Sequence, residues 1–117
     1  MDKFNEAKKA VINLVNTKNN VSYVEIERLF DELGFDWRGE GDIVASKCEN
    51  IIFWSGWNKE ALRVMNELLT EKLIDWEPCE WLIYFIDGKT LELPIVKKPR
   101  MYKTTHWLPR VFTIAKR

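Results

Sequence analysis

Three segments of the sequence carry apolar residues at helical spacing, and each starts just after a residue that can cap a helix. The capping residues are Asp2, Ser22 and Asn58, and Glu25 completes a capping box with Ser22. Because an amphipathic helix must bury one side against the rest of the chain, three such helices require a common core. The sequence therefore predicts helices over residues 3–16, 24–33 and 59–72.

Most of the other apolar segments have the pattern of strands. The strongest signal is the pair Asp87-Gly88, which separates apolar residues 81–86 from residues 90–96 and predicts a β-hairpin. Pro94 places the second of these two strands at a sheet edge. Three further strands are predicted at residues 51–54, 73–76 and 106–114, the last interrupted by Pro109.

Two linking segments are less regular. Residues 35–50 lack a sustained period and contain Gly39 and Gly41, which predicts a long ordered loop with a short helical turn near Val44. Residues 21–23 fit either a short edge strand or an extended link between the first two helices.

The order of these elements indicates the fold class. Helix, short strand, helix, helix, strand, wing and strand follow one another as in a winged helix, and the third helix runs directly into the strand after it. The 117 residues suffice for one core. We therefore expect one winged-helix-like α+β domain over residues 1–117, with three helices and a C-terminal antiparallel sheet and wing. The loop at 35–50 departs from the minimal fold, which leaves a different α+β arrangement open.

The formal net charge of zero hides an uneven distribution along the chain. Residues 1–87 contain 10 Lys and Arg against 17 Asp and Glu, a net charge of −7, whereas residues 88–117 contain 8 Lys and Arg and one acidic residue, a net charge of +7. A basic segment of this kind attracts phosphate or an acidic partner. The alternative is that it pairs with the acidic body of the same molecule.

Aromatic residues alternate with the cations of this basic segment, which is the pattern of a surface that binds single-stranded DNA. Cations neutralise phosphates, and exposed rings stack on unpaired bases. In a winged helix the third helix would contribute Lys59 and Arg63, although its glutamates leave it uncharged and make duplex reading unfavourable. The alternative for Tyr102 and Trp107 is a place in the core. The other predicted contacts are Lys97, Lys98, Arg100, Lys103, His106 and Arg110.

Six tryptophans are more than a core of this size readily absorbs. Exposed tryptophan anchors protein interfaces as readily as it stacks on bases. We expect Trp37 and Trp57, which lie near loops and glycine, to be exposed. The alternative function is therefore an adaptor or inhibitor that binds a replication or regulatory protein, or a second copy of the chain.

Signatures of catalysis are missing from the sequence. It has no phosphate-binding glycine loop and no nucleophile elbow, and its one histidine is His106. Cys48 and Cys79 are too scattered to suggest a zinc site, and both are expected to be free thiols in a reducing cytoplasm. The longest apolar run, residues 81–86, is too short to span a membrane. We predict no enzyme activity, cofactor, metal or membrane partner.

Two short segments of the sequence resemble a known group of proteins. Residues 93–109, Leu-Pro-Ile-Val-Lys-Lys-Pro-Arg-Met-Tyr-Lys-Thr-Thr-His-Trp-Leu-Pro, and residues 50–58, Asn-Ile-Ile-Phe-Trp-Ser-Gly-Trp-Asn, are similar to small accessory proteins encoded beside replication genes on staphylococcal mobile genomic islands. The resemblance implies a role in replication of a mobile genetic element or in its control, through single-stranded DNA.

Overall fold

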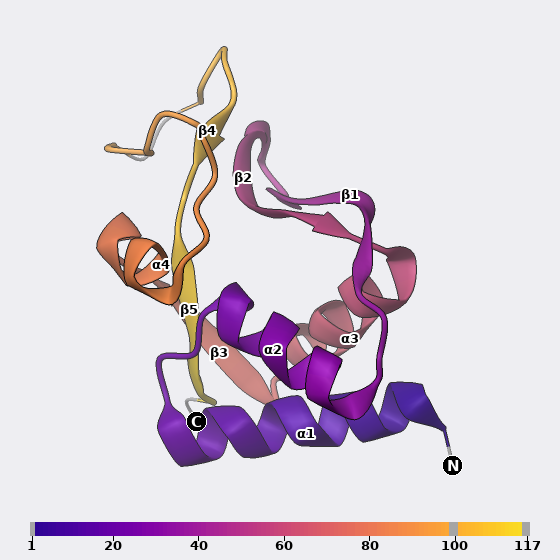
Figure 1. Ribbon diagram of the computed structural model, residues 1–117. Coiled ribbons are helices and arrows are strands. Elements are labelled where there is room, and N and C mark those ends of the chain that lie inside the picture. Colours follow the sequence, from indigo (N-terminus) through magenta and orange to yellow (C-terminus); the bar gives the residue numbers. More distant parts are fainter. Residues whose placement is uncertain (1, 99–100, 116–117) are drawn as a thin grey trace.

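The computed structural model describes residues 2–98 and 101–115, which form an α+β fold (Figure 1). The helices are α1 (Lys3–Lys18), α2 (Tyr23–Leu33), α3 (Lys59–Thr70) and α4 (Trp81–Asp87). The strands are β1 (Arg38–Ala45), β2 (Cys48–Trp57), β3 (Ile74–Pro78), β4 (His106–Trp107) and β5 (Arg110–Ile114).

The three predicted helices are confirmed, and local capping explains their starts. Asp2 accepts a hydrogen bond from the backbone N–H of Phe4, and Asn58 accepts one from that of Ala61. The predicted capping box at the start of α2 is present in both directions. These caps satisfy backbone donors that a helix start leaves without a partner.

The strands form two small sheets. In the first, β2 pairs with β1 in antiparallel and with β4 in parallel orientation. In the second, β3 pairs with β5 in antiparallel orientation, and Val21 adds an isolated bridge to Phe112 on the other edge of β5. The strands predicted at residues 51–54, 73–76 and 106–114 are thereby confirmed, with the break at Pro109.

The prediction of a loop over residues 35–50 is wrong, because β1 and the start of β2 occupy most of it. Its glycines permit close packing instead of forming a loop. A Cβ at Gly39 would lie 2.7 Å from the backbone of Asn58, and one at Gly41 would lie 2.7 Å from the carbonyl oxygen of Trp57. Without side chains at these positions, β1 can lie directly against the start of α3.

The predicted hairpin at Asp87-Gly88 is also wrong. Residues 81–87 form α4, and residues 90–96 form no strand apart from one bridge between Ile95 and Trp107. Gly88 ends α4 in the left-handed conformation with φ 96°, and its N–H donates to the carbonyl of Tyr84. A positive φ at glycine serves a helix end as well as a hairpin turn, so the sequence signal was ambiguous.

The core is built largely from aromatic rings. Trp54, Trp57 and Trp107 are fully buried, and Tyr23 stacks on Trp54 and meets Trp57 edge to face. The expectation that Trp37 and Trp57 are exposed is wrong, since both are buried. Burial of so many indoles requires polar partners for their N–H groups.

A single carboxylate satisfies two of these indoles. The buried Glu27 accepts hydrogen bonds of 2.8 Å from the ring nitrogens of Trp54 and Trp57 on one oxygen. Its other oxygen pairs with Lys89 at 2.8 Å. Lys89 also lies over the ring of Trp37. The network joins α2, β2 and the segment after α4.

The predicted α+β class is confirmed at this level. A winged helix with three helices is not confirmed, because α4 stands where a wing hairpin was expected and the strands form two sheets.

Candidate functional site

The predicted contacts of the basic segment fall into different environments. Lys97, Lys98 and Lys103 are exposed, and none of the three makes an ion pair with another described residue. Arg100 lies outside the described residues. The structure therefore leaves three lysines available at the surface of this segment.

The two rings expected to stack on bases are buried. The Trp107 side chain is 1% exposed, and its ring nitrogen donates to the carbonyl of Phe53. The Tyr102 hydroxyl accepts hydrogen bonds from the N–H groups of Lys97 and Lys98, and its ring lies 4.0 Å from that of the half-buried His106. The expected stacking surface is not formed by Trp107 and Tyr102, because the core and a local turn use them.

The predicted contacts on α3 belong to a surface of mixed charge. Arg63 pairs with Glu60 at 3.2 Å and with Glu67 at 3.1 Å. Lys8 of α1 forms a 3.0 Å ion pair with Glu67. The hydrogen bond between these two side chains raises the pKa of Lys8 and lowers the pKa of Glu67. Lys59 is exposed. The cations of α3 are thus balanced by its own glutamates, as the sequence indicated.

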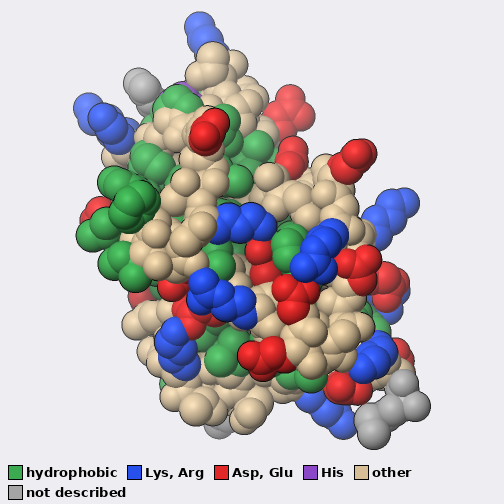
Figure 2. Space-filling model, in the orientation of Figure 1, with side chains coloured by type: hydrophobic (Ala, Val, Ile, Leu, Met, Phe, Trp, Pro, Cys, Tyr) green, Lys and Arg blue, Asp and Glu red, His purple; other side chains and the backbone are tan. Residues whose placement is uncertain are grey.

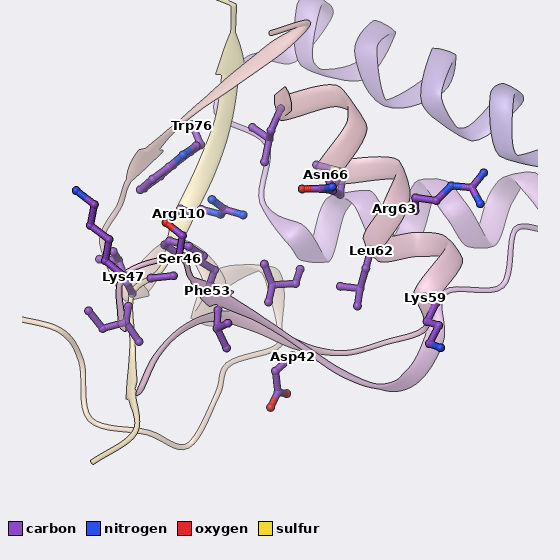
Figure 3. A pocket seen from close by; sticks show the side chains of 17 residues that line it. Asp42, Ser46, Lys47, Phe53, Lys59, Leu62, Arg63, Asn66, Trp76 and Arg110 are labelled. Atoms are coloured by element: carbon purple, nitrogen blue, oxygen red, sulfur yellow. The ribbon is translucent and has the colours of Figure 1, made fainter. Parts of the chain in front are cut away.

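Lys59 and Arg63 do share a feature with Arg110 that the sequence did not suggest. All three line one pocket of about 800 Å³, bounded by α3, the β1–β2 turn and the pair β3–β5 (Figure 3). Its walls are mainly apolar and include Phe53 and Trp76. The pocket therefore combines cations with an apolar interior.

Arg110 is the most unusual group in this pocket. The residue is 4% exposed, and its guanidinium lies 3.9 Å from the ring centre of Phe53 and 4.9 Å from that of Trp76. Its Nε and Nη2 atoms both donate to the hydroxyl of Tyr23, the former at 2.8 Å. Burial raises the pKa of Tyr23 to about 12 although Arg110 opposes the shift, so this hydroxyl stays neutral.

A second candidate surface lies on α4. Only Tyr84 of this helix is buried, whereas Phe85 is 62% and Ile86 74% exposed. Trp81, Leu82 and Ile83 are exposed as well. Figure 2 shows hydrophobic side chains gathered over α4, with both basic and acidic side chains at the margin of the patch. We call these five side chains the α4 patch.

Sequence reasoning missed the α4 patch because it treated residues 81–86 as one strand of a β-hairpin. The missed signal was the length of the apolar run. Five large apolar residues surround the single anchor Tyr84, and a strand or helix at a surface can bury only part of such a run. Some of these side chains had to face water.

Tyr84 and Asp87 hold α4 in place. The Tyr84 hydroxyl donates to the carbonyl of Arg110 at 2.6 Å and accepts from the N–H of Tyr23. Ser22 donates to the carboxylate of Asp87 at 2.7 Å. Attachment along one side leaves the other sides of the helix uncovered.

The cysteines, the possible metal ligands and the composition of the helices bear on whether the chain has what a thiol, metal or membrane site requires. Both cysteines are free, and burial, with nearby Glu80 and Asp87, raises the pKa of Cys79 to about 12. Within residues 2–98 and 101–115, no three His, Cys, Asp or Glu side chains form a group that could hold a metal ion. None of the described helices combines the length and apolar composition needed to cross a membrane.

No family model matches this sequence, and neither the curated proteins nor the solved structures contain a match to it.

Proposed function

We propose that this chain is an accessory protein that acts by binding another protein through the α4 patch. The observation that carries the proposal is the exposure of five large apolar side chains on one seven-residue helix. Contiguous apolar surface of this kind on a small domain is typical of interaction sites. Aromatic anchors such as Trp81 and Phe85 contribute most to such interfaces.

The partner that fits is a protein with an apolar groove. A short helix held from one side can enter a groove with its remaining sides. A link to replication of a mobile genetic element rests on the resemblance of residues 50–58 and 93–109 alone.

Site-specific photo-crosslinking tests this proposal. A photoreactive amino acid at Ile86 should give one protein adduct in cells that carry the gene, and the same group at Leu73 should not. Leu73 is a matched control because it is also apolar and exposed, but lies after α3. Absence of an adduct at Ile86, or the same adducts from both positions, would contradict the proposal.

The purified partner then allows a quantitative test. Phe85→Ala should weaken the complex about 30-fold, the effect of losing a central aromatic anchor, while Leu73→Ala should change affinity less than about twofold. Equal effects of the two substitutions would count against α4. An adduct of twice the chain's own mass, together with a dimer in sedimentation experiments, would show that the α4 patch binds a second copy of the chain. That result would overturn the proposal of a different partner protein.

Single-stranded DNA binding is a second candidate, favoured by the exposed lysines 97, 98 and 103, which have no ion-pair partner among the described residues. Replacing all three by Ala should lower the log-log salt slope for a labelled oligothymidylate by about 2, at about 0.7 for each phosphate contact. The double variant at Lys9 and Lys72, also exposed, serves as control. No binding by the parent at low salt, or an unchanged slope, would exclude this candidate.

We also propose that the fold is an elaborated winged helix. The order Val21, β5, β3 across one sheet supports this assignment, with Val21 between α1 and α2 and both strands after α3. In that case β1 and β2 are an insertion before the third helix, and α4 lies within the wing connection.

A further inference from the structure

The pocket around Arg110 has properties that the α4 patch does not explain. It lies between α3, the β1–β2 turn and β3–β5, and it is lined by apolar side chains such as Leu62, Leu69 and Leu108. A volume of about 800 Å³ is in the range that holds a small organic molecule. The α4 residues do not line it.

The orientation of Arg110 defines the polar end of this pocket. In Figure 3 its guanidinium projects from β5 into the space beside Trp76 and Phe53. Tyr23 takes hydrogen bonds from Nε and Nη2 only. Within residues 2–98 and 101–115, no group accepts a hydrogen bond from Nη1 and no carboxylate lies within ion-pair distance of the guanidinium.

A buried cation without an anionic partner is costly, and cation–π contact with Phe53 and Trp76 offsets only part of that cost. The edge formed by Nη1 and Nη2 has the geometry that binds a carboxylate through two parallel hydrogen bonds. The site offers one guanidinium among apolar walls. It therefore suits a ligand with a single negative charge and an apolar body better than a multiply charged phosphate ester.

We propose that this pocket binds a small carboxylic acid with an apolar chain, its carboxylate on Arg110 and its chain along α3. At the rim, the exposed Lys47 and Lys59 outnumber the exposed Asp42, so the net positive charge there attracts an anion. Arg63, also in the lining, is already engaged by Glu60 and Glu67 and contributes little to ligand binding.

Titration calorimetry with decanoate tests the site, and decanamide is its uncharged analogue. Decanoate should bind at about 1 mM or better, and decanamide at least about tenfold more weakly, because it lacks the charge that Arg110 recognises. Arg110→Gln should also weaken decanoate binding at least about tenfold, whereas Arg38→Gln, at an exposed arginine outside the pocket lining, should change it less than about threefold.

A second variant keeps the test decisive if Arg110→Gln fails to fold. Val44 is exposed on β1 and lines the pocket, so Val44→Trp should fill the space, leave Arg110 intact and abolish binding. The proposal is overturned if the parent binds no decanoate at millimolar concentration, if decanamide binds equally well, or if a folded Arg110→Gln or Val44→Trp variant binds like the parent. None of these results depends on the α4 patch.

Discussion

Tyr84→Phe removes a single oxygen atom and tests how α4 is attached to the rest of the protein. The hydroxyl is buried, accepts from the N–H of Tyr23 at 3.1 Å and donates to the carbonyl of Arg110 at 2.6 Å. Each such hydrogen bond contributes about 0.5–1.5 kcal/mol, and each buried group left unpaired costs about 1–3 kcal/mol. We expect the free energy of unfolding to fall by about 2–4 kcal/mol.

Urea denaturation followed by tryptophan fluorescence measures this change, and thermal denaturation should show Tm lower by about 8–16 °C, at about 4 °C for each kcal/mol. Thr113→Val is the matched control. The Thr113 hydroxyl is buried but has no hydrogen-bond partner among the described residues, so its loss should cost about 0.5 kcal/mol or less. A free energy of unfolding of Tyr84→Phe within about 0.5 kcal/mol of that of the parent would refute the reasoning. A control variant that lost as much stability as Tyr84→Phe would also refute it.

Three further outcomes are expected. Gly39→Ala should lower stability by about 1–3 kcal/mol in thermal denaturation, because its Cβ would lie 2.7 Å from the backbone of Asn58; unchanged stability would mean that β1 does not lie there. In a Cys48→Ser background, Cys79 should react with iodoacetamide at pH 8 roughly 1000-fold more slowly than an exposed thiol, since its pKa is raised from 9.0 to about 12. The rate should recover in guanidinium, and a fast reaction of the folded protein would contradict the burial of this thiol. Because the pKa of Tyr23 is raised from 10.0 to about 12 on folding, the stability that it contributes is complete below pH 10 and falls by about 3 kcal/mol between pH 10 and 12. Urea denaturation at pH 9, 10 and 11 measures this loss, and equal stability at all three would disprove it.

The sequence predicted those elements whose signals are local. The capping box of Ser22 and Glu25 and the cap at Asn58 involve residues a few positions apart, so they mark helix starts without knowledge of the fold. Gly88 was misread because its left-handed conformation suits a helix end and a hairpin turn equally. What decides between them is Tyr84, whose partners Tyr23 and Arg110 lie in distant parts of the chain.

The candidate sites depended even more on distant contacts. Arg110 looked like one cation among several in a basic segment, but β5 directs it between Phe53 and Trp76. Trp107 lies three residues earlier and is buried, with its ring nitrogen donating to the backbone carbonyl of Phe53. Residue type and charge alone cannot distinguish these positions from the exposed Lys103, because pairing with other strands determines which side chains turn inward.

The central position of β5 bears on how the protein emerges from the ribosome. β3 and Val21 both obtain their backbone partners from β5, which is synthesised after all four helices and β3. Helices α1 to α3 can form while β3 still has an unpaired edge. Nascent chains that lack residues 110–114 therefore expose this edge to other chains, and a premature stop just before β5 should give an aggregating product rather than a shortened domain.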